Sequence, residues 1–315
     1  MLNQRQMKEW IPEAVGHFKS IMPEIDVPYP EIHIVSANKA QETRDQIVER
    51  LHSRQNLFIY PGRMETIHGE FGDAILIYQK NVKENTFGIT DEKAIFQHCL
   101  WHELGQFFCI YMECPDDNLF RYMDHKVYLE DFISQLGYWF WSGFTSEVIA
   151  CRCDPDADVD WNTSDWHPVR NGLAILLRDT FNKYEDFIDQ YSIACYYAKI
   201  LADKRVRSYI EAANNGTLLT AEASGGNERM VTFREAGIDP TFMADVPDYY
   251  HPVLNELQKK LEVQLSQELY WKTNIDFVTD IGHMIEELRN IKLMHSSQKT
   301  FGKLLQGLSG GADNT

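Results

Sequence analysis

Segments with the composition of β-strands are confined to the first 80 residues of this sequence, and most of the remaining chain has helical spacing. Runs of β-branched and aromatic residues predict strands. They cover residues 31–36, 56–60 and 73–80. Apolar residues at helical spacing mark residues 3–20, 37–54, 90–112, 126–136, 138–153, 170–181, 184–212 and 251–295. Strands early and helices late predict an α+β fold, with a small mixed sheet followed by a largely helical C-terminal half.

The length of 315 residues allows one large domain or two ordinary ones. We predict an N-terminal subdomain over residues 1–153, which contains the sheet and two apolar helices. Residues 154–305 are predicted to form a helical C-terminal subdomain. Residues 306–315 contain three Gly and are predicted to be a flexible tail.

The charge balance bears on the partners of the chain. Asp and Glu number 47 against 30 Lys and Arg, which gives a net charge of −17. Nucleic acid backbones and anionic membrane surfaces repel such a chain, so we expect neither as a partner. No apolar run reaches the roughly 20 residues that span a bilayer. The six cysteines form no C-x-x-C pair and no secretion signal is evident, so we expect reduced thiols and a cytoplasmic location.

One short motif points to metal chemistry. A zinc-hydrolase helix carries His at i and i+4 on one face, and the Glu after the first His acts as general base. His102 and Glu103 fit this pattern, and Gln106 stands where the second His belongs. Glu147 follows 41 residues after Gln106, alone among apolar residues of a predicted helix. A carboxylate buried there needs a partner or a metal.

Over residues 74–151 the chain resembles the gluzincin group of zinc metallopeptidases, also called the wider thermolysin-like group. The resemblance rests on the motif and on the order of the elements: a strand at 74–79, then the motif helix, then the Glu-bearing helix. The resemblance implies a zincin-like domain that hydrolyses peptide bonds with zinc as cofactor and a peptide or protein as substrate. Carried over residue by residue, His102 is the first zinc ligand, Glu103 the catalytic base and Glu147 the third ligand. His251 is the candidate transition-state donor, with His167 as the other candidate.

The departure at Gln106 leaves alternatives open. A carboxamide offers only a carbonyl oxygen, whereas zinc prefers imidazole or thiolate, so zinc affinity should fall by at least ~10-fold. A metal between His98 and His102 would lie one turn earlier, but Cys99 then occupies the place of the base. The chain is alternatively an inactive, metal-free zincin scaffold that binds a peptide or protein. An unrelated helical interaction protein is the third possibility.

Several residues near the motif have a purely structural interpretation. Gly105 and Gly143 predict two helices in close contact, because each costs roughly 1 kcal/mol of helix propensity without a packing role. The aromatic run at residues 138–141 is predicted to belong to the core. Thr90 is predicted to cap the motif helix at its N-terminus.

Overall fold

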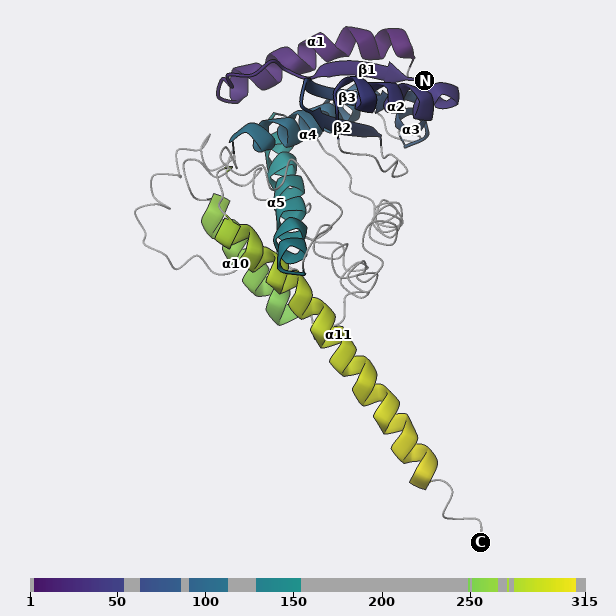
Figure 1. Ribbon diagram of the computed structural model, residues 1–315, viewed down its shortest axis with the longest axis vertical. Helices are drawn as coiled ribbons and strands as arrows, with labels where there is room; N and C mark the ends of the chain where they lie inside the picture. Colours follow the sequence, from purple (N-terminus) through teal and green to yellow (C-terminus); the bar gives the residue numbers. More distant parts are fainter. Residues whose placement is uncertain are drawn as a thin grey trace.

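The computed structural model describes residues 3–53, 63–85, 91–112, 129–153, 249, 251–265, 271 and 275–309. Its elements, shown in Figure 1, are α1 (Gln4–Ile21), β1 (Glu31–Val35), η1 (Ala37–Lys39), α2 (Ala40–Arg50), β2 (Met64–Gly69), β3 (Gly72–Tyr78), α3 (Gln79–Asn85), α4 (Glu92–Met112), α5 (Leu129–Cys153), α10 (His251–Leu265) and α11 (Ile275–Ser309). The described chain is mostly helical and contains one three-stranded mixed sheet. The prediction of a mixed α+β fold with a small sheet is confirmed.

The central strand of the sheet is β3. It pairs in parallel with β1 and antiparallel with β2, in the order β1-β3-β2. Residues 74–78 of β3 are all buried and read Ala-Ile-Leu-Ile-Tyr. A strand covered on both faces needs such a continuous apolar run. β2 mixes polar with apolar residues and lies at the edge of the described sheet.

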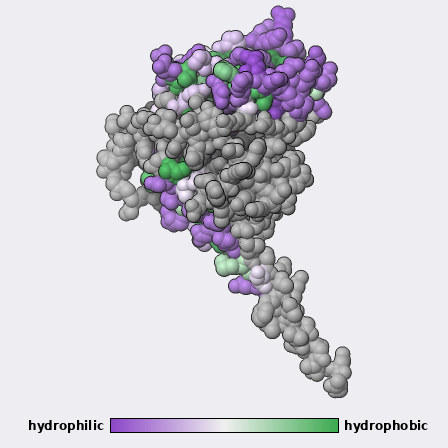
Figure 2. All heavy atoms as spheres, viewed as in Figure 1, coloured by the Kyte–Doolittle hydropathy of each residue, from purple (hydrophilic) through white to green (hydrophobic). Residues whose placement is uncertain are grey.

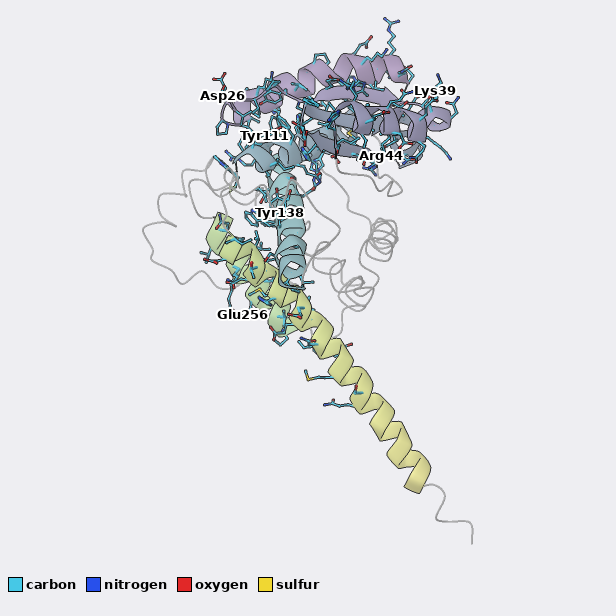
Figure 3. All side chains as sticks on the ribbon, in the orientation of Figure 1. Asp26, Lys39, Arg44, Tyr111, Tyr138 and Glu256 are labelled. Carbon is cyan, nitrogen blue, oxygen red and sulfur yellow. The ribbon has the colours of Figure 1, made fainter. Side chains whose placement is uncertain are left out.

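Helices cover both faces of the sheet. On one face α2 packs over a small core made of Val35, Ile47, Leu51, Ile67, Ala74, Leu76 and Tyr78. This face also holds the buried Arg44 of α2, which contacts the Glu65 carboxylate of β2 through Nη2 at 2.9 Å (Figure 3). On the other face, Ile75 and Ile77 belong to the larger core that includes residues of α1 and α4. The alternation of side chains along β3 therefore divides it between two cores.

The helical layers continue away from the sheet. α4 packs on α5, α5 packs on α11, and α10 lies along α11 (Figure 1). Val253 and Leu257 of α10 and Ile281 of α11 belong to the same core as Trp141 of α5. The described C-terminal helices thus complete the core of the N-terminal part. The last turns of α11 extend away from the rest of the described chain (Figure 1).

The close packing of α4 on α5 depends on Gly105. A Cβ atom at Gly105 would lie 2.9 Å from the Ser146 Cα atom, a separation that real Cβ atoms essentially never show. This confirms the predicted packing role of Gly105. At Gly143 a Cβ atom would meet no atom of the described residues within 4 Å, so within this part of the chain the predicted packing role of that glycine is wrong. Tyr138, Phe140 and Trp141 are buried, as predicted for the aromatic run.

Other boundaries differ from the sequence predictions. Residues 126–136 and 138–153 were separate predicted helices, but α5 is continuous, and its Gly137 sits against the Val278 carbonyl of α11. The single predicted helix 251–295 is two helices, α10 and α11, with a turn at Trp271 between them. α11 continues to Ser309, so the start of the predicted tail is helical. The predicted strand 56–60 and the predicted helices 170–181 and 184–212 lie outside the described residues.

The described chain has further surface and thiol features. Hydrophilic residues gather over the N-terminal part on the face shown in Figure 2. Within the described ranges, no helix is both long and apolar enough to cross a membrane. Cys99, Cys109 and Cys153 form no disulfide within the part of the chain that the structure describes.

Candidate functional site

α4 presents a stripe of polar side chains along its length. Its N-terminus is capped by Asp91, whose Oδ1 accepts hydrogen bonds from the backbone N–H groups of Lys93 and Ala94 at 3.1 and 3.0 Å. The predicted cap, Thr90, lies outside the described residues. From this start, residues 98, 102 and 106 follow at intervals of four and lie one above another on the helix.

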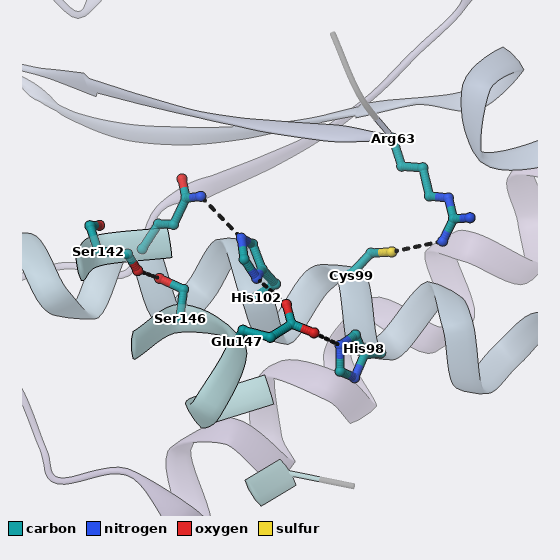
Figure 4. Close-up of polar contacts among 8 residues, drawn as sticks. Arg63, His98, Cys99, His102, Ser142, Ser146 and Glu147 are labelled. Carbon is teal, nitrogen blue, oxygen red and sulfur yellow. Dashed lines mark hydrogen bonds and ion pairs between the residues drawn. The ribbon is translucent and has the colours of Figure 1, made fainter. Parts of the chain in front are cut away.

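Glu147 of α5 joins the two histidines of this stripe. Its side chain is only 1% exposed. Glu147 Oε1 lies 3.0 Å from His98 Nε2, and Oε2 lies 2.8 Å from His102 Nδ1 (Figure 4). Because burying a carboxylate without partners is costly, these two contacts explain how Glu147 is tolerated inside an apolar helix pair. The structure therefore brings His102 and Glu147 together, as expected.

The second nitrogen of His102 faces Gln106. Gln106 Nε2 lies 3.2 Å from His102 Nε2. Since a carboxylate only accepts hydrogen bonds, the His102 proton lies on Nδ1, and Nε2 accepts from the Gln106 amide. Both ring nitrogens are thus hydrogen-bonded. Glu147 and Gln106 lie on opposite edges of one imidazole, so this arrangement does not converge on a single metal position together with His102.

His98, by contrast, lies on the same side of His102 as Glu147. The nitrogen atoms His98 Nε2 and His102 Nδ1 both contact the one Glu147 carboxylate. Two imidazoles and a carboxylate therefore meet at one point between α4 and α5. We call His98, His102 and Glu147 the His–Glu–His cluster. His98 is 2% exposed and Glu147 is fully buried, whereas His102 is partly exposed.

Glu103 faces a different element. Thr66 of β2 donates a hydrogen bond from Oγ1 to Glu103 Oε2 at 2.6 Å, and the same hydroxyl lies 3.3 Å from the Glu103 carbonyl oxygen. The Glu103 carboxylate is therefore held beside the edge strand, on a side of α4 that differs from the His102–Glu147 contact. Glu103 is partly exposed, and its neighbour Leu104 is buried in the core.

Further polar residues lie along the contact between β2 and α4. The Arg63 guanidinium contacts Cys99 Sγ at 3.6 Å (Figure 4). At the other end of β2, His68 Nδ1 lies 2.8 Å from Asp73 Oδ1. Tyr111 of α4 donates its hydroxyl hydrogen bond to the other Asp73 oxygen. The sequence prediction missed these residues because it did not identify β2.

The remaining predicted site residues are less informative. His251 is the first residue of α10, and its side chain is not among those that the structure describes. His167 lies outside the described residues.

Among the described residues, no group of three or more His, Cys, Asp or Glu side chains is arranged to hold a metal ion. Comparison of the chain with protein-family models, curated proteins and solved structures finds no match.

Proposed function

We propose that this chain is a zincin-like protein of the zinc metallopeptidase type, in which His98, His102 and Glu147 hold zinc. The observation that supports the proposal is the position of Glu147, whose two oxygens contact two imidazoles one helical turn apart. Two His and one Glu form a ligand set of catalytic zinc sites. Compared with the gluzincin pattern, the ligand pair on the motif helix is shifted one turn toward its N-terminus. The ligand Gln106 is not needed in this arrangement.

The donor set fits zinc in type. Two ligand atoms about 2.1 Å from a tetrahedral zinc ion stand about 3.4 Å apart. The corresponding nitrogen–oxygen distances in the His–Glu–His cluster are 3.0 and 2.8 Å. Because the two imidazoles contact different oxygens of Glu147, the side chains have to rearrange before all three can contact one ion. In this structure the three side chains form hydrogen bonds with one another, and no group of the described residues is arranged to hold a metal ion.

Each residue has a distinct role in this proposal. Zinc, when bound, supplies a Lewis acid that lowers the pKa of water and polarises a substrate carbonyl. Glu103 is the proposed general base; in this structure its carboxylate accepts a hydrogen bond from Thr66 beside β2, on another side of α4 from the His–Glu–His cluster. Gln106 fixes the His102 ring through its amide. The base follows the second His of the pair rather than the first, which is a further departure from the gluzincin pattern.

The substrate would be a peptide or protein that lies along β2. As the edge of the described sheet, β2 can offer backbone groups to an extended peptide, which is a common mode of peptide recognition. Glu103 and Thr66 contact one another at this strand.

A metal-free scaffold that binds a peptide is the second candidate function. It is favoured by the hydrogen bonds of the His–Glu–His cluster, which satisfy both Glu147 oxygens without a metal. In this case the cluster is a structural element between α4 and α5. The edge strand β2 would still be the site of peptide binding.

Zinc titration by calorimetry separates the candidates. The chelator-treated full chain is compared with three variants: His98→Gln, Gln106→His and His283→Gln. His283 is an exposed histidine of α11 and controls for zinc held by surface imidazoles. We expect about one zinc per chain, with His98→Gln weakening affinity by at least ~10-fold. Gln106→His and His283→Gln should have little effect.

Two other results would change the assignment. If Gln106→His strengthens zinc binding by ~10-fold or more and His98→Gln does not matter, the gluzincin ligand positions apply and the shifted set is wrong. If neither wild type nor any variant binds zinc, the metal-free scaffold is the better description. Thermal unfolding gives a second readout, because zinc at 100 times its Kd should stabilise a binding chain by about 2.7 kcal/mol.

A further inference from the structure

The two halves of α11 differ in their surroundings. In its first half, Val278, Ile281, Ile285 and Leu288 are buried in the core, at intervals of three and four residues. Beyond Leu288, no described side chain of this helix is fully buried: Ile291 is partly buried against the core, and Met294 is 58% exposed. Figure 1 shows the second half extending away from the other described elements. We call residues 289–309 the distal segment.

The distal segment has a charge opposite to that of the chain. It contains four Lys or Arg and one His, and it has no Asp or Glu, although the whole chain carries a net charge of −17. Its basic positions are Arg289, Lys292, His295, Lys299 and Lys303. Its large apolar positions are Ile291, Leu293, Met294, Phe301, Leu304, Leu305 and Leu308. The segment is therefore a local basic patch in an acidic protein.

The basic and apolar positions lie on opposite sides of the helix. Each residue advances by about 100° around an α-helix. On this geometry all seven apolar positions fall within an arc of about 160°, and all five basic positions fall within an arc of about 120° on the opposite side. The segment is helical throughout its length. Such complete separation is the pattern of a helix that lies between an apolar and an anionic environment.

We propose that the distal segment binds the surface of an anionic lipid bilayer. A basic amphipathic helix lies in the plane of the interface, with its apolar side among the acyl chains and its cations near the headgroups. Each Lys or Arg close to such a surface strengthens binding by roughly 5-fold. The segment rests on the surface of the membrane and does not cross it.

The shape of the molecule reconciles this proposal with the acidity of the whole chain. The distal segment has 21 residues, which span about 30 Å of helix. The Debye length at physiological ionic strength is about 8 Å. The acidic charges of the folded body that lie more than this length from the membrane surface are therefore largely screened from it. Net charge alone predicts no membrane contact because it averages over this separation.

A second copy of the chain is a less suitable occupant. Paired helices in a coiled coil meet along a narrow apolar seam, flanked by residues of opposite charge that pair between the helices. The distal segment has an apolar arc wider than such a seam, and it contains no acidic residue to pair with its lysines. The charge composition therefore favours an anionic lipid surface.

Vesicle co-sedimentation of the full chain tests the proposal. Phosphatidylcholine vesicles are compared with vesicles of phosphatidylcholine and phosphatidylglycerol at about 3:1. The test variant combines Lys292→Gln, Lys299→Gln and Lys303→Gln. The matched control removes the same charge elsewhere through Lys8→Gln, Lys19→Gln and Lys39→Gln, at three exposed positions. Circular dichroism checks that both variants remain folded.

We expect wild type and the control variant to bind the anionic vesicles and not the neutral ones. The test variant should bind the anionic vesicles on the order of 100-fold more weakly, and a Phe301→Ser variant should also bind less. Equal binding to both kinds of vesicle, or equal loss in the control variant, would overturn the proposal. A stable dimer in light scattering that Phe301→Ser dissociates would also overturn the proposal, because the segment would then bind a second copy of the chain.

Discussion

Removal of the Glu147 carboxylate should destabilise the protein strongly. Glu147 is fully buried, and its oxygens accept hydrogen bonds from His98 and His102 at 3.0 and 2.8 Å. Glu147→Ala leaves two imidazoles without this acceptor and creates a cavity between α4 and α5. Hydrogen bonds to a charged group contribute about 1.5–3 kcal/mol each, so loss of the two that Glu147 accepts costs about 3–6 kcal/mol. We expect a loss of unfolding free energy in that range.

Urea denaturation of the metal-free chain measures this loss through the midpoint at constant m-value. Glu9→Ala is the matched control, because Glu9 makes an exposed salt bridge with Arg5 on α1. Exposed pairs of this kind contribute less than about 1 kcal/mol. Glu147→Gln keeps the shape of the side chain and should lose less than Glu147→Ala. If Glu147→Ala costs no more than Glu9→Ala, the carboxylate does not hold the two helices together and the His–Glu–His cluster is wrong.

Two further predictions concern other parts of the fold. Hydrogen bonding from Arg50 lowers the pKa of Glu31 from about 4.5 to about 2. The ionised pair therefore stabilises the fold above pH 4.5, and this contribution disappears as pH falls toward 2. NMR titration should show a higher Glu31 pKa in Arg50→Gln, and the stability should change by less than about 1 kcal/mol because both side chains are half-exposed. Gly105→Ala should destabilise the chain by about 1–3 kcal/mol through contact with Ser146. Gly143→Ala, whose added Cβ meets no described atom within 4 Å, should stabilise the chain by up to about 1 kcal/mol in the same denaturation assay. Equal effects of the two substitutions would contradict this account of helix packing.

Local sequence patterns predicted the elements whose buried residues are apolar. The continuous apolar run of β3 and the helical spacing of α1 and α4 are visible in the sequence because burial repeats at the period of the backbone. β2 was missed for the opposite reason. Its polar residues Glu65, Thr66 and His68 contact groups that come from other elements of the fold. Only the tertiary arrangement shows that these residues belong to a strand.

The sequence predicted which residues belong to the candidate site better than it predicted how they are arranged. A lone Glu147 among apolar residues indicates a required partner, and the structure provides one in His102. The spacing of four residues relates His102 equally to His98 and to Gln106, so the sequence could not decide between them. The decision depends on which edge of the His102 ring faces α5. Gly105 allows the close contact of α4 with α5, and it is from α5 that Glu147 reaches this ring.

The hydrogen bonds of the His–Glu–His cluster also bear on how tightly zinc could bind. Hydrogen bonds to charged groups contribute about 1.5–3 kcal/mol each. Zinc would have to replace the two that Glu147 accepts, and 1.4 kcal/mol corresponds to tenfold in affinity. The metal-free cluster therefore opposes zinc by roughly two to four orders of magnitude. With the proposed ligand set, the hydrogen bonds of the cluster would limit the zinc affinity of wild type, whereas with the gluzincin ligand positions the missing imidazole at Gln106 would limit it. Only the second cause is corrected by Gln106→His.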